Sequence, residues 1–312
     1  MLLKIAETKD ITDRIRLITL TNANDDALPH YMAGAHLDFD LGEIGTRSYS
    51  LIDFEPIAPA PETYHIAVQA EPDGAGGSRA MHQLEVGTRV DTTAPKNSFE
   101  LHDGDAPALL IAGGIGVTPI ISFATALSTR GTPFAFHYAT QTRAVCAFAD
   151  QLQTAFGDNL ILWFDDINQI DIAKVLGEAP SDAHIYCCGP KGMIEAVKTA
   201  AVAAGYPTDR TRFELFETPQ PGKSDTSFEV EINDGRTFTI PVGKSIIEVL
   251  EEHGVDVMYD CQRGDCGICQ TDIIDGTPDH RDVVLSQDER TSGDVMQICV
   301  SRAKSPRLVL DI

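Results

Sequence analysis

Apolar and polar positions alternate in short runs over the first third of the chain. These runs are separated by Gly, Pro, Asn and Asp, and they cover residues 15–20, 36–41, 64–70 and 88–93. Alternation of this kind is typical of a β-strand with one buried face, and several short strands between turn residues predict a barrel or a sandwich. We therefore expect residues 1–104 to fold as a β-barrel domain.

From residue 105 onward, continuous apolar runs alternate with helical stretches. The apolar runs are residues 108–112, 134–139, 160–164 and 184–187, and the helical stretches are residues 119–129, 145–156, 171–176 and 191–204. Strands that are apolar on both faces need cover on both faces, so this alternation predicts a parallel sheet between two helical layers. We expect residues 105–217 to form this α/β domain.

A third pattern follows residues 218–227, which are rich in Pro, Gly and Ser and predict a linker. After it, two alternating runs flank an Asn-Asp-Gly turn and predict a β-hairpin: residues 228–232, 233–235 and 238–242. Ser245 and Glu248 then have the spacing of a capping box for a helix that ends at Gly254. We expect residues 228–312 to form an α+β domain, which makes the chain multidomain.

Composition and charge exclude some classes of function. Among the 312 residues the formal net charge is −23, and so acidic a surface repels a nucleic-acid backbone. The acidity either serves solubility or steers a basic partner, and composition does not separate the two. The uncharged run of residues 108–127 approaches membrane-spanning length, but its glycines and Pro119 indicate a strand, a turn and a helix. Because no signal-peptide pattern opens the chain, we expect a cytoplasmic protein without nucleic-acid or membrane partners.

Four of the seven cysteines have the spacing of a metal-cluster site. Cys261, Cys266 and Cys269 lie within one short segment, and Cys299 stands alone downstream. In a reducing compartment, clustered cysteines more often bind metal than form disulfides. A zinc site is the alternative, but zinc sites usually show two closely spaced pairs, whereas this spacing is typical of plant-type [2Fe–2S] proteins. We expect these four thiolates to hold a [2Fe–2S] cluster.

Two other segments carry groups that suit a flavin. Arg47 can pair with a phosphate, the Tyr49 ring can stack on the isoalloxazine, and Ser50 can hydrogen-bond the ring edge. About thirty residues further on, a glycine turn opens a short helical stretch, and backbone N–H groups at such a turn cradle a phosphate. The ordinary alternative is an exposed strand and turn. The candidate flavin ligands are Arg47, Ser48, Tyr49, Ser50, Gly76, Gly77 and Ser78.

A second glycine turn lies between an apolar strand and a helix, which is the context of a pyrophosphate site. It follows residues 108–112, and we expect Thr118 to cap the helix and Pro119 to open it. A Cys-Gly-Pro turn ends the apolar run of residues 184–187. Arg143, after the second strand of this domain, suits either NADH or a 2′-phosphate. The candidate nucleotide ligands are Gly113, Gly114, Gly116, Thr118, Cys188, Gly189 and Pro190.

The three cysteines outside the cluster have simpler interpretations. Cys146 lies in a predicted helical stretch, and we expect both it and Cys187 in the core. A redox-active thiol is the alternative role for Cys188, and it requires an environment that lowers the thiol pKa.

Together these segments resemble the phthalate dioxygenase reductase family of the ferredoxin–NADP reductase superfamily, which includes the vanillate demethylase reductases. The resemblance covers essentially the whole chain. Residues 95–99 resemble the segment that closes the family's flavin barrel, and residues 228–312 resemble a plant-type ferredoxin. The family implies FMN rather than FAD, NADH as electron donor, a Rieske-type non-haem iron oxygenase as acceptor, and a monomer. It also implies three catalytic residues, with Thr118 and Cys188 beside the nicotinamide and Phe216 over the flavin face.

Two positions depart from the family pattern. Relatives commonly carry Arg where this chain has Ala75, and often Lys where it has Gln69. Both changes remove positive charge near the expected flavin phosphate, which leaves Arg47 and Arg79 to compensate.

The combination of sites defines the expected chemistry. A hydride carries two electrons and a [2Fe–2S] cluster accepts one, so a flavin, which can hold two, one or none, is needed between them. The expected activity is that of an NADH-dependent flavin and iron–sulfur oxidoreductase. Two alternatives remain, a reductase for another acceptor such as a cytochrome or a separate electron carrier, and a redox sensor that signals by binding.

Overall fold

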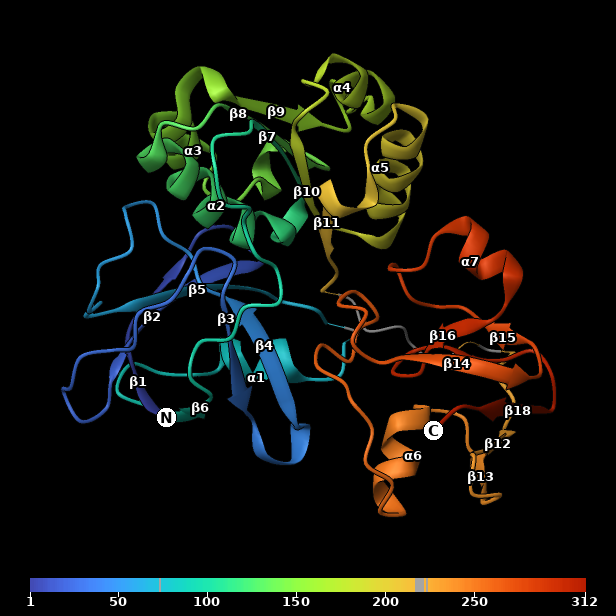
Figure 1. Cartoon of the computed structure of the whole chain (residues 1–312). Coiled ribbons are helices and arrows are strands. Elements are labelled where there is room, and N and C mark those ends of the chain that lie inside the picture. The colour runs from blue at the N-terminus through green and yellow to red at the C-terminus, as the bar shows by residue number, and fades with distance from the viewer. Residues whose placement is uncertain (73, 217–221, 223) are drawn as a thin grey trace. The chain divides into compact units, whose positions relative to one another are not determined.

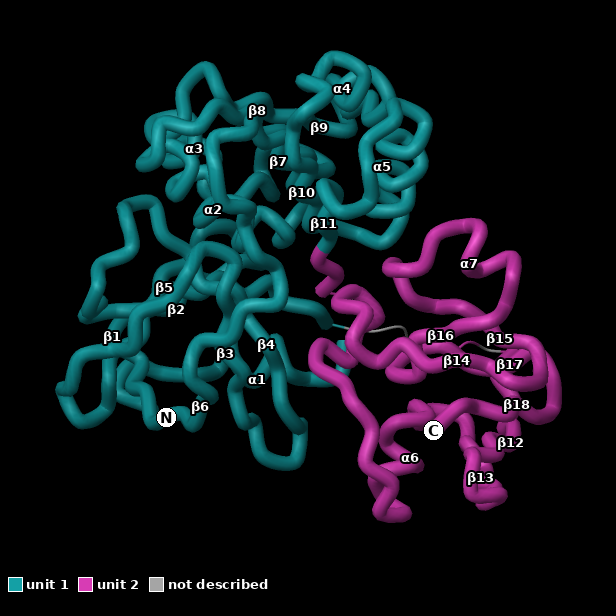
Figure 2. Tube along the Cα trace, viewed as in Figure 1, with its two compact units in different colours: residues 1–213 teal, residues 214–312 magenta. Residues whose placement is uncertain are grey.

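A computed structural model describes residues 1–72, 74–216, 222 and 224–312 (Figure 1). Contacts divide the chain into two compact units, Met1–Phe213 and Glu214–Ile312 (Figure 2). The first unit contains both the predicted barrel and the predicted α/β domain, and a boundary between them at residue 104 stays a prediction. The predicted linker lies in part outside the described residues.

The first unit opens with a six-stranded antiparallel sheet that closes on itself. Its strand order is β4-β3-β6-β1-β2-β5, and Leu51, directly after β4, forms a bridge with Ile66 of β5. The predicted β-barrel is therefore confirmed. Its elements are β1 (Leu2–Asp10), β2 (Ile15–Asn22), β3 (His36–Asp40), η1 (Gly42–Ile44), β4 (Thr46–Ser50), β5 (Tyr64–Gln69), α1 (Gly77–His82) and β6 (Arg89–Thr92).

Alternation along the strands builds the interior of the barrel. Leu37 and Phe39 of β3 are fully buried, as are Leu3 and Ile5 of β1. Removing such side chains from water is the main favourable contribution to folding. The candidate flavin ligands lie on β4, at one end of the sheet order. Arg47 and Tyr49 are paired with the buried Phe39 and Leu37, and Ser48 is paired with Asp38.

The rest of the first unit is a five-stranded sheet in the order β11-β10-β7-β8-β9. Neighbours from β10 to β9 run parallel, and the helix pairs α2–α3 and α4–α5 lie on opposite sides of the sheet (Figure 1). The predicted α/β domain is confirmed. The strands are β7 (Ala108–Gly113), β8 (Phe134–Thr140), β9 (Leu160–Phe164), β10 (His184–Cys188) and β11 (Thr211–Glu214). The helices are η2 (Gly114–Gly116), α2 (Val117–Arg130), η3 (Arg143–Val145), α3 (Ala149–Phe156), η4 (Gly157–Asn159), α4 (Ile172–Glu178), α5 (Lys191–Ala203) and η5 (Thr208–Arg210).

Two predictions in this region need correction. The helix expected over residues 145–156 begins only at Ala149, because the chain first makes the short turn η3 and then extends at Cys146. Cys146 is buried, as expected, but it lies in a loop rather than in a helix.

The uncharged run of residues 108–127 is divided among β7, η2 and α2, in agreement with the predicted strand, turn and helix. Among the described residues no helix has the length and apolar character needed to cross a membrane.

The barrel is joined to the α/β domain by hydrogen bonds from α2. The Ser122 hydroxyl donates to the carbonyl of Leu51 at 2.8 Å, and the Thr125 hydroxyl donates to the carbonyl of Asp53 at 2.7 Å. The ring of Phe123 also packs against Phe99, with centroids 4.9 Å apart. These contacts fix the end of β4, and with it the candidate flavin segment, against the helix that follows the second glycine turn.

The second unit contains a mixed sheet in the order β13-β12-β18-β14-β16 and a separate pair, β15-β17. β12 and β18 are parallel, whereas β12 and β13 form the predicted hairpin. Ser245 and Glu248 make the predicted capping box at the start of α6. The elements are β12 (Phe228–Glu231), β13 (Thr237–Ile240), α6 (Ile246–Glu252), β14 (Gln270–Asp275), β15 (Pro278–Asp279), α7 (Gln287–Ser292), β16 (Val295–Gln297), β17 (Arg302–Ala303) and β18 (Arg307–Leu310).

A buried ion-pair network fastens the start of this unit to its body. The Arg281 guanidinium donates to both carboxylate oxygens of Asp225, at 2.6 and 2.8 Å, and the Asp225 side chain is 4% exposed. Arg302 lies 3.7 Å from the same carboxylate and donates to the carbonyls of Thr226, Pro241 and Lys244. The hydrogen bonds from Arg281 lower the pKa of Asp225 to about 2.

We expect Asp225→Asn to destabilise the second unit, because it leaves Arg281 and Arg302 buried without their shared counter-ion. Breaking a buried pair on one side costs about 3–5 kcal/mol. Hydrogen exchange of β12 and β18 at pH 7 measures this loss. The matched control is Asp234→Asn, since Asp234 pairs with Arg236 where both side chains are 50% exposed, and such pairs contribute at most about 1 kcal/mol.

The same substitution has a defined pH dependence. Because the folded-state pKa of Asp225 lies below its usual value of 3.8, its stabilisation is complete above about pH 4 and is lost as the pH falls towards 2. The difference in hydrogen-exchange protection of β12 and β18 between wild type and Asp225→Asn should therefore become smaller as the pH falls from about 4 to about 2. An equal loss of protection in Asp225→Asn and Asp234→Asn would contradict this assignment.

Candidate functional site

The candidate flavin segment occupies β4 rather than the beginning of a longer strand. Arg47 is paired with Phe39, Ser48 with Asp38, and Tyr49 with Leu37 across the ladder to β3. The Tyr49 ring meets the Phe39 ring edge-on, with centroids 5.5 Å apart. Burial raises the pKa of Tyr49 to about 12, so its hydroxyl stays protonated at neutral pH. A half-buried aromatic ring held in this way has a face that a planar cofactor can stack on.

Arg47 and the first glycine turn meet in space, as their shared role in phosphate binding requires. A Cβ added to Gly77 would lie 2.7 Å from Cγ and 2.8 Å from Nε of Arg47. Only glycine lets the arginine stem cross the backbone this closely. α1 begins at Gly77, so the guanidinium lies beside N–H groups of a helix start. Together they offer the donors and positive charge that bind a phosphate.

The other members of this turn are engaged in holding the loop. The Ser78 hydroxyl accepts the N–H of Glu71 at 3.0 Å, and Arg79 donates to the carbonyl of Pro72 at 3.0 Å. Gln69, which stands at a position where relatives often have Lys, donates to the Glu71 carboxylate. Arg47 likewise donates to a backbone carbonyl, that of Thr46 at 2.7 Å, so Arg47 and Arg79 both remain candidates to compensate for the two departures from the family pattern.

A polar cluster behind β4 was not predicted. The Ser48 hydroxyl donates to Oδ1 of Asp38 at 2.6 Å, and Lys96 donates to Oδ2 at 2.8 Å. Nε2 of His36 lies 3.6 Å from Oδ1. Burial alone would raise the pKa of Asp38, but the bonds from Lys96 and Ser48 outweigh it and lower the pKa. Lys96 belongs to residues 95–99, and its backbone pairs with His36 along β3. This segment therefore extends the pairing that β6 begins along β3, and its role in closing the barrel stays a prediction.

The nucleotide turns lie where an α/β sheet usually binds its ligand. The chain runs from β7 outward to β8 and β9, and then returns to place β10 on the other side of β7. Ligands bind at the carboxyl ends of strands beside such a reversal. The glycine turn follows β7 and the Cys-Gly-Pro turn follows β10, and Ala112 is paired with Cys188. The structure therefore brings the two predicted segments together at one edge.

The two turns are packed so closely that side chains are excluded between them. A Cβ on Gly116 would lie 2.3 Å from the carbonyl oxygen of Cys188, and one on Gly113 would lie 2.8 Å from Pro190. The Cα of Gly113 itself is 3.1 Å from where a Cβ on Gly189 would be. A bare backbone surface of this kind lets a pyrophosphate approach the N–H groups at the start of α2.

Thr118 does not cap α2 as predicted. The helix begins at Val117 after Gly116, and the Thr118 hydroxyl donates to the carbonyl of Ile115 at 3.1 Å. The reason is the short turn η2, which brings the start of the helix two residues earlier than Pro119. Thr118 is buried at the turn, so its predicted place beside the nicotinamide stays a prediction.

The neighbouring cysteines are both buried at the end of β10. Burial raises the pKa of the Cys187 thiol, and Cys187 is a core residue, as expected. Cys188 has no solvent-exposed surface, which does not suit a redox thiol that exchanges with partners in solution.

Phe216, the third predicted catalytic residue, belongs to a different unit from the other two. It is a half-buried residue just after β11 and falls in the second unit, whereas Thr118 and Cys188 fall in the first. Its predicted position over the flavin stays a prediction.

The four clustered cysteines meet in the second unit. Contacts between thiols join Cys261 to Cys266 and Cys299, and join Cys299 to Cys269. The contacts with Cys266 and Cys299 lower the pKa of Cys261. Two of the sulfurs also have polar neighbours: the N–H of Arg263 donates to Cys261, and Cys269 donates to Gln297, both at 3.4 Å.

This donor set fits a binuclear iron–sulfur cluster. Each iron of a [2Fe–2S] cluster takes two thiolates. Gly264 packs closely on Val300, because a Cβ there would lie 2.6 Å from Cγ2 of that residue. It lets the cysteine loop pack on the segment that carries Cys299.

Charged side chains brace the cysteine loop from one side. Asp265 accepts the backbone N–H of Leu215 at 2.8 Å, and Arg263 lies 3.6 Å from both Asp265 and Glu214. All three side chains are largely buried. Burial raises the pKa of Glu214 to about 8. The chain entering the second unit is therefore held against the cysteine loop, a contact that spacing in the sequence did not indicate.

Comparison with known proteins agrees with these sites. Residues 230–304 match the 2Fe-2S iron-sulfur cluster binding domain family. The chain is 39% identical over 305 residues to phenoxybenzoate dioxygenase subunit beta of Ectopseudomonas oleovorans, covering 96% of this chain and 93% of the relative. It is 38% identical over 300 residues to vanillate O-demethylase oxidoreductase of Pseudomonas putida, covering 93% of each. The solved structure of phthalate dioxygenase reductase is 34% identical, with a TM-score of 0.75, and the match covers 100% of this chain and 98% of that one.

We expect Gly116→Ala to disturb both stability and nucleotide binding. The added methyl group would overlap the Cys188 carbonyl, and such overpacking costs about 1–3 kcal/mol. Thermal unfolding and titration with NAD⁺ measure the two effects. The matched control is Gly192→Ala in α5, where a Cβ meets nothing within 4 Å. Alanine is the better helix former there, so the control should be neutral or slightly stabilising. Unchanged nucleotide binding in Gly116→Ala would contradict the site.

Proposed function

The chain belongs to the phthalate dioxygenase reductase family, and we propose that it is the reductase component of an oxygenase system, carrying electrons from NADH to a Rieske-type non-haem iron oxygenase. The attachment of β4 to α2 through Ser122 and Thr125 is the observation that carries this proposal. It holds β4, the candidate flavin-binding strand, beside the glycine turn before α2, which is the candidate nucleotide-binding turn. The same chain also carries four grouped cysteines. Relatives named as subunits of dioxygenase and demethylase systems support the same role.

The chain's own residues have distinct tasks in this role. When bound, FMN and the [2Fe–2S] cluster supply the conversion of a two-electron hydride into single electrons. Arg47 and the N–H groups of Gly77 and Ser78 would hold the flavin phosphate, and Tyr49 and Ser50 would orient the ring. The turns at Gly113–Gly116 and Cys188–Pro190 would orient the nicotinamide. Cys261, Cys266, Cys269 and Cys299 would hold the iron.

Asp38 is a positioning residue in this proposal. It accepts a hydrogen bond from the Ser48 hydroxyl at 2.6 Å and so holds β4 in place, which would fix the strand that orients the flavin. No general acid or base is required, since hydride and electrons are the transferred species. This agrees with the raised pKa of Tyr49, whose hydroxyl does not ionise at neutral pH.

Three finer points belong to the same proposal. The donor is NADH, the protein acts as a monomer, and it works in the cytoplasm. The family resemblance supports the first two points, and the reduced state that cysteine thiolate ligands require supports the third.

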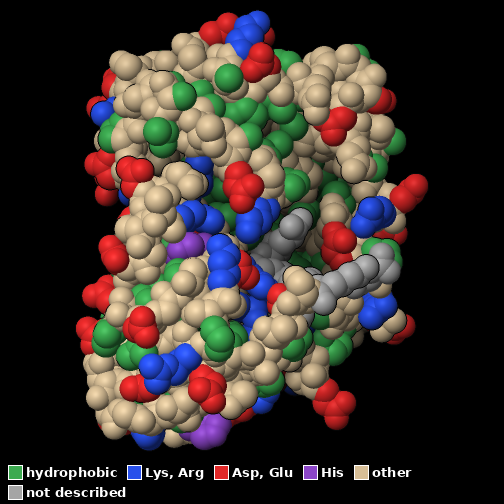
Figure 3. All heavy atoms as spheres, turned by 90° about the vertical axis from the view of Figure 1, so that its right-hand side faces the viewer, with side chains coloured by type: hydrophobic (Ala, Val, Ile, Leu, Met, Phe, Trp, Pro, Cys, Tyr) green, Lys and Arg blue, Asp and Glu red, His purple; other side chains and the backbone are tan. Residues whose placement is uncertain are grey.

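The acceptor is proposed to dock on the acidic second unit. Asp256 and Asp260 directly precede the cysteine loop, and Asp272 follows it; all three are exposed. Figure 3 shows Asp and Glu side chains spread widely over one face of the molecule. Charges at the edge of an interface mainly set the rate of encounter. A basic partner would therefore be steered to the cysteine loop.

Anaerobic titration with NADH tests the electron path. We expect the flavin and iron–sulfur absorbance bands both to bleach, with full reduction near about one and a half NADH per chain, because flavin and cluster together take three electrons. In Cys299→Ser the flavin should still bleach, with about one NADH per chain. Bleaching of the flavin alone in the wild type would show that electron exit is misassigned, and no response at all would rule out the nicotinamide site.

Salt dependence tests the docking surface. Raising ionic strength from about 0.05 to 0.5 M shortens electrostatic range several-fold, so electron transfer to the partner oxygenase should slow. Reduction of a neutral small acceptor should not change. Transfer rates to the oxygenase that are independent of salt would exclude electrostatic steering.

A further inference from the structure

The loops that follow β8 and β9 set the charge at the ribose end of the nucleotide site. Gly113 of β7 is paired with Ala139 of β8, so the loop after β8 begins beside the glycine turn. In α/β folds, an acid after the second strand suits the ribose diol of NADH, whereas Arg suits the 2′-phosphate of NADPH. Arg143 lies three residues beyond the end of β8, in the position where this choice is made.

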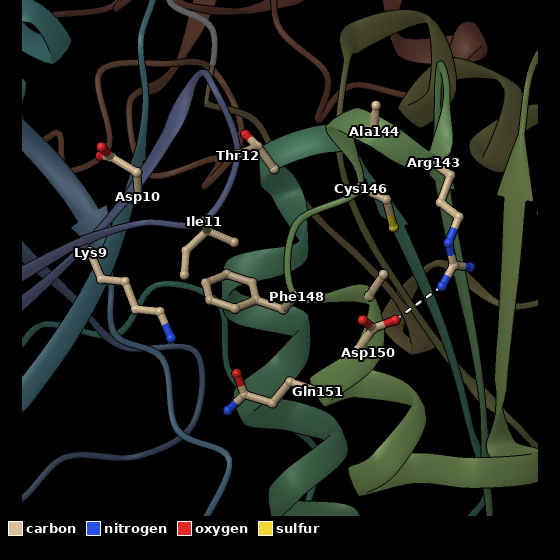
Figure 4. A pocket seen from close by; sticks show the side chains of 11 residues that line it. Lys9, Asp10, Ile11, Thr12, Arg143, Ala144, Cys146, Phe148, Asp150 and Gln151 are labelled. Carbon is tan, nitrogen blue, oxygen red and sulfur yellow. Dashed lines mark hydrogen bonds and ion pairs between the residues drawn. The ribbon is translucent and has the colours of Figure 1, made fainter.

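Arg143 is already paired with an acid. Its Nη2 lies 3.0 Å from Oδ1 of Asp150, in the first turn of α3. Figure 4 shows the pair at the wall of a cavity of about 420 Å³. Both side chains are exposed, Arg143 at 63% and Asp150 at 95%. The pair is therefore open to an approaching cofactor, and Asp150 competes with a 2′-phosphate for the guanidinium of Arg143.

The surroundings of Arg143 are acidic as well. The N–H of Asp165, directly after β9, donates to the carbonyl of Thr140 at 3.1 Å, so this loop lies against the end of β8. Asp165 and Asp166 are exposed. In the loops of residues 141–148 and 165–171, which the structure describes throughout, Arg143 is the single cation. A phosphate monoester carries close to two negative charges at neutral pH and would meet net repulsion here.

We propose that Asp150 is a specificity-determining residue that selects NADH over NADPH by holding Arg143 in an ion pair. The guanidinium that would otherwise grip a 2′-phosphate through charge-assisted bonds is occupied. The ribose diol needs no such cation, so NADH binding does not suffer. This inference rests on the proposed function and adds to it the group that decides between the two nicotinamide cofactors.

The test compares kcat/KM for NADPH and NADH with a dye as acceptor. In Asp150→Asn the NADPH-to-NADH ratio should rise about two- to five-fold rather than reverse, because exposed ion pairs contribute at most about 1 kcal/mol. In the double variant Arg143→Gln/Asp150→Asn the gain should disappear, since the freed cation is gone. Asp158→Asn is the matched control, because it removes the same charge from an exposed position beyond the other end of α3. Its ratio should equal that of the wild type.

Two results would overturn the inference. One is a ratio in Asp150→Asn that matches Asp158→Asn, and the other is a gain that persists in the double variant. A wild-type preference for NADPH would overturn it too, while leaving the electron path of the proposed function intact. Failure of the wild type to accept electrons from either nucleotide would instead contradict the proposed function, and the inference with it.

Discussion

Two hydroxyl groups on α2 join the candidate flavin-binding segment to the candidate nucleotide-binding turn, the two sites between which electrons would pass. Ser122 and Thr125 donate to the main chain just after β4, and neither bond depends on the side chain that it meets. The flavin segment and the nucleotide turn belong to different sheets, so nothing in either sheet alone would place them side by side. Buried hydrogen bonds to backbone carbonyls are specific in direction and distance. They make the helix after the glycine turn a fixed support for both.

Close backbone packing is the second constraint, and it explains why glycines gather where they do. At Gly77 an arginine stem crosses the chain, and at Gly116 the carbonyl of Cys188 does. In both places two segments distant in sequence approach until no Cβ fits between them. The same closeness leaves N–H groups uncovered by side chains, which is the surface that phosphate groups bind. Packing and ligand binding therefore depend on the same residues.

Much of this arrangement can be read from local pattern, and the failures have physical reasons. Periodicity found the barrel, the parallel sheet and the hairpin, and spacing found the four cysteines. It missed α7 because none of the residues from Gln287 to Ser292 is apolar or buried, so no hydrophobic periodicity marks the helix, although Ser286 and Glu289 repeat the capping-box spacing seen at α6. It also missed Asp38, which meets Ser48 only through strand register. The start of α2 was misplaced because a short turn winds into the helix before Thr118.

The contacts at the start of the second unit change the interpretation of residues 218–227, the Pro- and Gly-rich segment that was predicted to be a linker. Leu215 is bound to Asp265 before this segment, and Asp225 is bound to Arg281 after it, and all four residues belong to the same unit. The described residues on both sides of this segment are therefore anchored to one body, so the segment does not connect the two units. The connection between the units lies upstream, at the junction of Phe213 and Glu214. Since doubling the length of a loop between fixed ends costs only about 0.6 kcal/mol, insertions between the two anchors should be tolerated without disturbing either anchor.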